Sequence, residues 1–165
     1  MPAQGVQVVS DELAGFIESG VSVLVGTRDA GLLPSAMRGM GVRVEEGGAE
    51  VTVFLPEATS ARAIANLRDN GHVAVCFSRP QDHRSIQVKG RAVAIRAAGA
   101  SDRPVVERYR GALAESLAFV GVPVPTTLRL AHWPCHAVRV RVEGVFQQTP
   151  GPDAGAPLGA GGRAA

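Results

Sequence analysis

Residues 34–55 read PSAMRGMGVRVEEGGAEVTVFL, and this stretch predicts two strands joined by a turn. The four residues 45–48, Glu-Glu-Gly-Gly, have the composition of a turn. In residues 51–55 every second side chain is valine or leucine, and this two-residue period is typical of a strand. Residues 34–44 precede the turn and are expected to form the partner strand. The stretch therefore favours an antiparallel β fold.

The rest of the chain adds further strands and a few helices around this hairpin. Six strands are expected, at residues 21–27, 34–44, 51–55, 73–77, 85–95 and 136–147. Helices are expected from Ser10 to Gly20, from the Thr59-Ser60 pair to Asn70-Gly71, and over residues 104–120. This order lacks the regular alternation of strand and helix found in doubly wound sheets. We therefore expect a mainly β (α+β) fold, a six-stranded antiparallel barrel or half-open roll with two or three flanking helices.

A chain of 165 residues, 45% of them hydrophobic, is long enough for one domain with a substantial core. The domain is expected to cover residues 1–149, because residues 150–165 are mostly glycine, proline and alanine and should form a flexible tail. The net charge is only +2, so no nucleic-acid partner is expected. No apolar run is long enough to span a bilayer and no leader pattern is present, which predicts a cytoplasmic protein without a membrane partner.

Basic residues in and after the hairpin point to an anion site. Arg38 and Arg43 are five residues apart, which places them on opposite faces of a regular strand, but two intervening glycines make a bulge plausible. Arg62 falls in the first turn of the helix that Thr59-Ser60 begins. Free N–H groups at a helix start, together with a hydroxyl and a guanidinium, suit a phosphate. A capping serine and a solvated arginine explain the same residues without a ligand.

Taken together, four features of residues 13–96 resemble the pyridoxamine 5′-phosphate oxidase-like flavin-binding split barrels. They are the Arg38-x4-Arg43 pair, the strand ending in Phe54-Leu55-Pro56, the Ser60-x-Arg62 helix start, and residues Arg84 to Gly90. The family shows Arg-x4-Lys, an aromatic residue with Tyr-Thr, Ser-Arg-Lys, and a strand reading Arg-Gln-Val-x-x-x-Gly, in the same order. The resemblance implies a split barrel that holds flavin mononucleotide (FMN), with the cofactor at the interface of a homodimer.

The resemblance also implies which residues hold the cofactor. These candidate cofactor-binding residues are Arg38, Arg43, Leu55, Ser60, Arg62, Ser85 and Gln87. The arginines and Ser60 would bind the phosphate and ribityl chain, and Leu55 stands at the family's tyrosine position. Ser85 stands where the family has a flavin-contacting glutamine, and Gln87 lies two residues on, on the same strand face. An FMN-dependent oxidoreductase or reductase acting on a small molecule follows, with no catalytic residue and no metal ligand assigned.

Departures from the family pattern leave the activity open. The Arg-x-His-x-Arg cluster that grips pyridoxal phosphate is missing after Trp133-Pro134, where Arg139 and Arg141 share one strand face, so true pyridoxamine phosphate oxidation is not expected. The deazaflavin F420 is an alternative cofactor whose longer anionic tail would use the same arginines. Haem is another, with His132 or His136 as axial ligand, as in some relatives. A carrier or sensor without turnover and a pure interaction module are the non-enzymatic alternatives.

Overall fold

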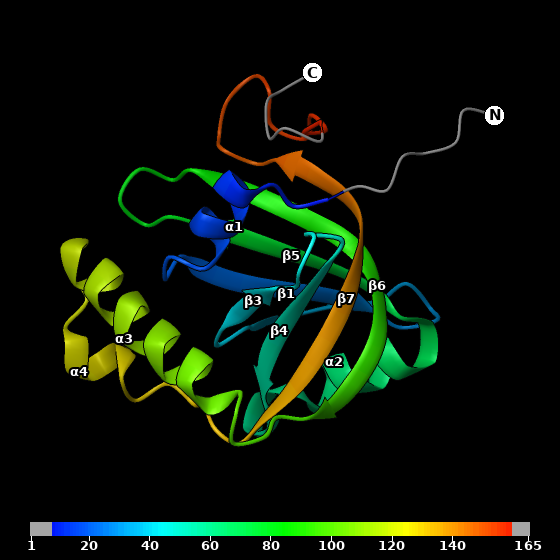
Figure 1. Cartoon of the computed structure of the whole chain (residues 1–165), viewed down its shortest axis with the longest axis horizontal. Coiled ribbons are helices and arrows are strands. Elements are labelled where there is room, and N and C mark those ends of the chain that lie inside the picture. Colours follow the sequence, from blue (N-terminus) through cyan, green and yellow to red (C-terminus); the bar gives the residue numbers. More distant parts are fainter. Residues whose placement is uncertain (1–7, 160–165) are drawn as a thin grey trace.

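Seven antiparallel strands form one sheet in the computed structural model, which describes residues 8–159 (Figure 1). The strands are β1 (Ser22–Arg28), β2 (Pro34–Arg38), β3 (Val42–Val44), β4 (Glu50–Pro56), β5 (His72–Ser78), β6 (Ser85–Ala97) and β7 (Cys135–Gln147). The helices are α1 (Asp11–Ile17), α2 (Glu57–Asn70), α3 (Arg103–Phe119) and α4 (Val124–Thr127). In the sheet the strands follow the order β2-β1-β5-β6-β7-β4-β3. The mainly β class predicted from the sequence is confirmed, with seven described strands where six were expected.

The additional strand arises because the predicted strand 34–44 is divided in two. At the division the chain crosses between two other strands: the Gly39 N–H donates to the Val23 carbonyl of β1 at 3.0 Å, and the Met40 N–H donates to the Phe54 carbonyl of β4 at 2.8 Å. A Cβ at Gly39 would lie 2.8 Å from a methyl of Val23, so the close crossing requires glycine. The crossing joins β1 to β4 and closes the barrel, while β2 pairs with residues Leu24 to Arg28 of β1.

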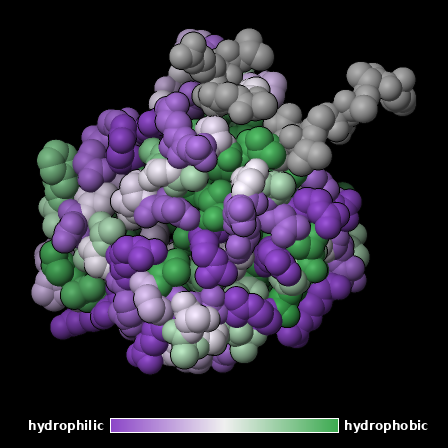
Figure 2. Space-filling view, viewed as in Figure 1, coloured by the Kyte–Doolittle hydropathy of each residue, from purple (hydrophilic) through white to green (hydrophobic). Residues whose placement is uncertain are grey.

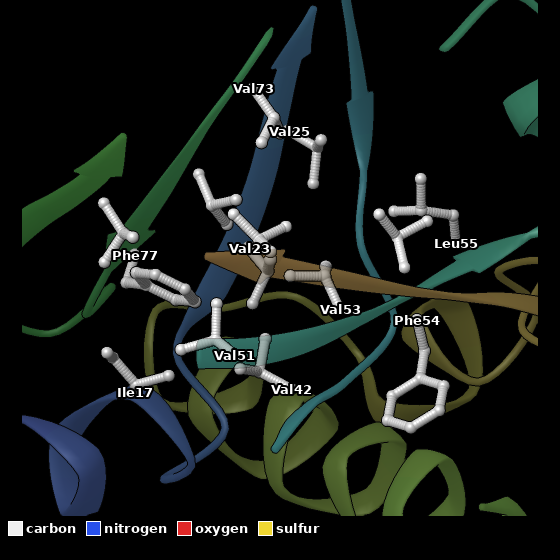
Figure 3. Packing of buried hydrophobic residues seen from close by; sticks show 14 of the residues in the cluster. Ile17, Val23, Val25, Val42, Val51, Val53, Phe54, Leu55, Val73 and Phe77 are labelled. Carbon is white, nitrogen blue, oxygen red and sulfur yellow. The ribbon is translucent and has the colours of Figure 1, made fainter. Parts of the chain in front are cut away.

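Inward-facing side chains of the strands fill the barrel. Val23 and Val25 of β1, Val51 and Val53 of β4, and Phe77 of β5 are almost completely buried and meet in its centre (Figure 3). Each such side chain contributes about 1.5–3 kcal/mol when it is fully buried. Because side chains alternate along a strand, the residues between these valines face outward. That outer surface of β1 and β5 carries the candidate site.

Helix α2 begins earlier than the sequence predicts. Its first residue is Glu57, directly after the strand-ending Pro56, so Ser60 lies inside the first turns and does not cap the helix. Pro56 has no side-chain group to cap the free N–H groups, and the Glu57 N–H instead donates to the Pro134 carbonyl at 2.9 Å. The helix ends at Gly71 as predicted, where a φ of 71° favours glycine.

Helix α3 packs closely on the outside of the barrel, on a different side from α2 (Figure 1). A Cβ at Gly41 would lie 3.6 Å from the Val106 backbone, and one at Gly20 would lie 2.5 Å from the Ala112 side chain. The turn between α3 and α4 exposes Phe119, and Figure 2 shows apolar surface at that edge of the molecule. Within residues 8–159 no helix is long and apolar enough to cross a bilayer.

The segment after residue 150, which its composition predicted to be a flexible tail, contacts the barrel through Ala156 and Leu158. The Leu158 side chain is 4% exposed and packs with the core cluster. Its N–H donates to the Val145 carbonyl at 2.8 Å, and the Gln147 N–H donates to the Ala156 carbonyl at 2.8 Å. One buried leucine and these backbone hydrogen bonds hold a glycine- and proline-rich segment that composition alone does not predict to be ordered. Residues 160–165 lie outside the described part of the chain.

Candidate functional site

The outward faces of β2, β1, β5 and β6 form one surface, which we call the open sheet face. The antiparallel register aligns its side chains in rows that run across the four strands. The first row consists of Arg38, Leu24, Cys76 and Gln87. The next row consists of Ala36, Gly26, Ala74 and Lys89. With strands about 4.8 Å apart, the Cα atoms of Arg38 and Gln87 are about 14 Å apart, and the two rows are about 7 Å apart.

Arg38 is partly buried at one end of the first row and is held by hydroxyl groups. Its Nη1 donates to Ser22 Oγ at 3.0 Å. The Tyr109 hydroxyl, which donates to the Val21 carbonyl at 2.8 Å, lies beside the same guanidinium. Burial raises the pKa of Tyr109 well above its usual value, and the Arg38 charge opposes that rise. No carboxylate within residues 8–159 pairs with Arg38, so its charge is available to an anion.

Ser85 and Gln87 lie at the other end of the open sheet face. The Ser85 hydroxyl is buried and already bonded, 2.8 Å from Ser78 Oγ and 2.9 Å from the His83 carbonyl. Gln87 is partly exposed, and its amide oxygen has one long contact, 3.5 Å from Gln148 Nε2. Of the two residues proposed to contact a flavin ring, Gln87 therefore has the freer polar group.

Arg43 is engaged in a network of ion pairs. Its Nη1 lies 3.1 Å from Asp102 Oδ1 and its Nε 3.3 Å from Glu45 Oε1. The same Asp102 carboxylate, almost fully buried, accepts from Arg96 at 2.6 Å and from the Gly99 N–H at 2.9 Å. These donors, Arg96 first among them, hold the pKa of Asp102 well below its usual range. Since Asp102 directly precedes α3, the network fixes the start of that helix to β3 and β6.

Ser60, Arg62 and Leu55 occupy three different environments. Ser60 is completely buried near the start of α2, and its hydroxyl has no hydrogen-bond partner in residues 8–159. Arg62 is exposed on the same helix. Leu55 is completely buried in the barrel core, so its side chain does not reach the outer surface. A buried unbonded hydroxyl costs about 1–3 kcal/mol, and at 0% exposure Ser60 is not open to a ligand.

A shallow groove of about 360 Å³ crosses the second row of the open sheet face. We call it the basic groove. Small residues that include Gly26, Ala74 and Gly90 line it, together with Arg28, His72, Lys89 and Glu143. Burial, Arg91 and Arg28 lower the pKa of His72.

The two histidines proposed as haem ligands lie near the start of β7. His132 has both ring nitrogens near protein oxygens: Nδ1 is 3.1 Å from the Leu130 carbonyl and Nε2 is 3.6 Å from Glu107 Oε1. His136 is partly buried within β7. The neighbouring Cys135 donates to the His132 carbonyl at 2.7 Å, and burial raises its thiol pKa to about 12. His132 therefore offers no uncommitted nitrogen to an iron.

The structure thus brings Arg38 and Gln87 onto one row and does not place Arg38, Arg43 and Arg62 in one described pocket. Both hairpin arginines face away from the barrel interior, but they contact α3 at Tyr109 and Asp102, about 10 Å apart along the helix axis. Sequence reasoning missed Ser22 and Tyr109 as the groups that orient Arg38. The alternation of β1 carried a signal for Ser22, since it shares an outward face with Leu24. The contact of Tyr109 depends on how α3 docks.

The fold is shared with solved structures of low sequence identity. A candidate pyridoxamine 5′-phosphate oxidase from Lactobacillus delbrueckii is 14% identical, with a TM-score of 0.56 over 88% of this chain and 99% of its own. A protein named F420 reductase is 18% identical, with a TM-score of 0.55 over 79% of this chain and 93% of its own. An FMN-binding protein from Syntrophomonas wolfei is 11% identical, with a TM-score of 0.52 over 81% of each chain.

Searches of protein-family models and of curated proteins found no match. At the identities of the structural neighbours, the similarity establishes the fold alone. That fold is the split barrel of the pyridoxamine 5′-phosphate oxidase-like proteins, as the sequence motifs predicted.

Proposed function

We propose that this chain binds FMN on the open sheet face and acts as a flavin-dependent oxidoreductase on a small-molecule substrate. The observation that supports this most is Arg38, a partly buried guanidinium oriented by two hydroxyls and without a carboxylate partner in residues 8–159. In the same row Gln87 offers an amide about 14 Å away. This spacing suits a ligand with an anionic group at one end and a hydrogen-bonding ring at the other.

Two residues of the open sheet face are suited to bind parts of FMN. Arg38 would hold the phosphate, and Leu24, 47% exposed between Arg38 and Gln87, offers apolar surface to the rest of the molecule. The unbonded hydroxyl of Ser60 is completely buried near the start of α2, so we do not assign it to the ligand. Arg43 does not fit, because Asp102 and Glu45 already neutralise it. We therefore assign the phosphate to Arg38 and treat Arg62 as a secondary candidate.

Bound FMN would supply hydride or electron transfer, which no side chain supplies. The part of the protein is to bind and orient it: Arg38 holds the charged end and Gln87 donates to or accepts from the ring. The open sheet face exposes Leu24 to water, so one barrel alone does not shield a ring bound there. We propose that a second copy of the chain covers this face in a homodimer.

F420 is the second candidate cofactor. Arg28 and Lys89 extend the positive charge of the open sheet face beyond Arg38, and a longer anionic tail would reach them. The similarity in fold to an F420 reductase is consistent with this choice. Haem is a third candidate; both ring nitrogens of His132 have protein partners, so His136 would be its axial ligand.

The experiment begins with the purified full-length protein and whatever small molecule it releases on denaturation. The visible spectrum and the mass of that molecule distinguish FMN, F420 and haem. Protein without a ligand is then titrated with each of the three by calorimetry. We expect FMN to bind with a Kd on the order of micromolar or tighter. A protein that takes up none of the three contradicts the proposal and leaves an interaction module.

Turnover is tested separately. The FMN-loaded protein is reduced and mixed with candidate acceptors, and reoxidation is followed by absorbance. Reoxidation faster than oxygen alone supports an oxidoreductase. Tight FMN binding with no acceptor above the oxygen rate indicates a carrier or sensor.

A further inference from the structure

We infer that the basic groove binds a second ligand, a small molecule with a flat apolar body and an anionic carboxylate or phosphate group. The inference deepens the proposed function, on which it rests, because a molecule in the groove would lie beside the flavin and thus belongs to the substrate class. Its support is the shape and charge of the groove and its distance from Arg38.

The groove is hollow because the neighbouring residues Gly26 and Ala74 of one row are small, and Gly90 also lines it. A Cβ built on Gly26 would have one neighbour, the Ala74 carbonyl oxygen, at an ordinary contact distance of 3.7 Å. The backbone therefore tolerates a larger residue at this position. Glycine leaves open a space that a valine or leucine would fill, and Ala74 opposite it on β5 is also small.

Two cations of the groove have no carboxylate partner within residues 8–159. Arg28 donates from Nη1 to the backbone carbonyl of Asp29 at 3.3 Å, and the Lys89 ammonium lies 4.8 Å from the centre of the Phe146 ring. Glu143 also lines the groove, but its carboxylate is paired with Arg91 at 3.7 Å. A ligand that enters the groove therefore meets unmatched positive charge, which favours an anion.

His72 adds a polar group of a different kind. Burial and the charges of Arg91 and Arg28 lower its pKa, and Glu143 opposes this. Its imidazole is therefore predominantly neutral at neutral pH and can donate one hydrogen bond and accept another. It can bond a carbonyl or hydroxyl of the ligand without adding a third charge.

The position of the groove separates it from the proposed phosphate anchor. Its row lies about 7 Å from the row of Arg38 and Gln87, about two residues along each strand. A molecule bound over Gly26 and Ala74 would be next to a ring held by Gln87 and would leave Arg38 to the cofactor. The ligand expected in the groove is therefore an anion with an apolar body, bound beside the flavin.

The test compares two probes that differ only in charge, 2-naphthoate and its uncharged amide. Each is titrated by calorimetry into the FMN-loaded protein, and inorganic phosphate is a third probe without the apolar body. We expect naphthoate to bind at least tenfold more tightly than the amide and than phosphate. Equal binding of naphthoate and its amide, or no binding of naphthoate, overturns the inference.

Three variants locate the probe. Arg28→Met and Lys89→Met should each weaken naphthoate binding about tenfold, and Gly26→Val should block it by filling the hollow. Arg108→Met, which removes an exposed cation of α3, is the matched control and should leave naphthoate binding unchanged. Unchanged naphthoate affinity in the three groove variants, with thermal midpoints like that of the wild type, overturns the inference.

The FMN affinity of the same variants separates this inference from the proposed function. If Arg28→Met and Lys89→Met keep their affinity for FMN but lose naphthoate, the groove is a distinct subsite. If they lose FMN as well, the groove belongs to the cofactor and the inference fails. If neither the wild type nor any variant binds FMN, the proposed function fails. If naphthoate still binds to the wild type in that case, the groove remains a binding site for small anions.

Discussion

Arg38 and Arg43 belong to one motif in the sequence but have different partners in the structure. Arg38 is oriented by hydroxyls, whereas Arg43 is neutralised by a carboxylate 59 residues away. The family resemblance identified Arg38 and Gln87 as cofactor-binding candidates, and the spacing of Arg38 and Arg43 predicted opposite strand faces unless a bulge intervened. No local pattern predicts the Asp102 pair, because it depends on where α3 docks. At this scale the sequence indicates which side chains face outward, and tertiary contacts decide which of them remain available.

Replacing Arg38 by methionine should weaken FMN binding by roughly ten- to hundred-fold, the effect of losing one charge-assisted phosphate contact. Methionine keeps much of the apolar volume and removes the charge. Calorimetric titration of FMN into the ligand-free variant measures the change. Arg62→Met, on the exposed face of α2, should have a smaller effect, and Arg108→Met should have none. An Arg38 variant with the affinity of the wild type contradicts the phosphate assignment.

Tyr109→Phe tests the group that orients Arg38. The variant keeps the ring packed in the core but removes the hydroxyl, which leaves the Val21 carbonyl without its donor. We expect a loss of about 1–3 kcal/mol in the free energy of unfolding. Urea denaturation measures it. We also expect FMN affinity to fall several-fold because Arg38 loses a neighbour. A variant that is destabilised but binds FMN as the wild type does would show that Tyr109 is purely structural.

Among the elements, α3 depends on the Asp102 network for its attachment to the sheet. The donors around Asp102 hold its folded-state pKa below the usual value of about 3.9. The carboxylate therefore contributes its full stabilisation above about pH 4, and that contribution is lost as the pH falls toward the lowered pKa. Asp102→Asn should reduce the free energy of unfolding by about 1–2 kcal/mol at neutral pH, because solvent screens the exposed parts of the arginines.

Thermal melts between about pH 6 and pH 2.5 check the sign of this effect. The wild-type midpoint should fall more steeply with acid than that of Asp102→Asn, so that the two curves approach each other at low pH. Parallel curves would mean that Asp102 does not carry the predicted linkage.

Close approach of α3 to the start of β1 gives a second prediction for this element. Gly20 has a φ of 80°, and a Cβ there would lie 2.5 Å from the Ala112 side chain. Gly20→Ala should therefore destabilise the fold by about 1–3 kcal/mol through backbone strain and overpacking. Gly15→Ala is the matched control, because a Cβ at this helical position meets nothing within 4 Å. It should be neutral or stabilise α1 by up to about 1 kcal/mol. Urea denaturation measures the free energy of unfolding of both variants, and equal losses would contradict the prediction.

The sequence predicted the elements better than their boundaries. Alternation located all the strand regions, but residues 34–44 became two strands because the crossing at Gly39 is a tertiary feature that closes the barrel. Helix α2 begins directly after Pro56, where the Glu57 N–H donates to the Pro134 carbonyl, a tertiary contact that the local sequence does not predict. The ordering of Leu158 likewise depends on a barrel surface that composition does not describe.

At the scale of the whole molecule, the proposed function requires that a second surface covers the open sheet face. Leu24 is 47% exposed in the middle of this face, between Arg38 and Cys76. A flavin bound along this row needs a second surface to exclude water, and a symmetric dimer would supply the same face twice. The groove and the cofactor row would then lie in one cleft between the two copies.

Leu24→Arg should disrupt this dimer, because it places an unpaired charge in the centre of an apolar contact. We expect light scattering after gel filtration to give a dimeric mass for the wild type and a monomeric mass for the variant. FMN affinity should fall with it, since the ring loses its cover. Phe119→Arg is the control: Phe119 is 75% exposed at the C-terminal end of α3 and is not part of the four strands that form the open sheet face, so this variant should remain dimeric and bind FMN. A dimer that survives Leu24→Arg but dissociates with Phe119→Arg would move the interface to α3 and α4 and leave the open sheet face uncovered.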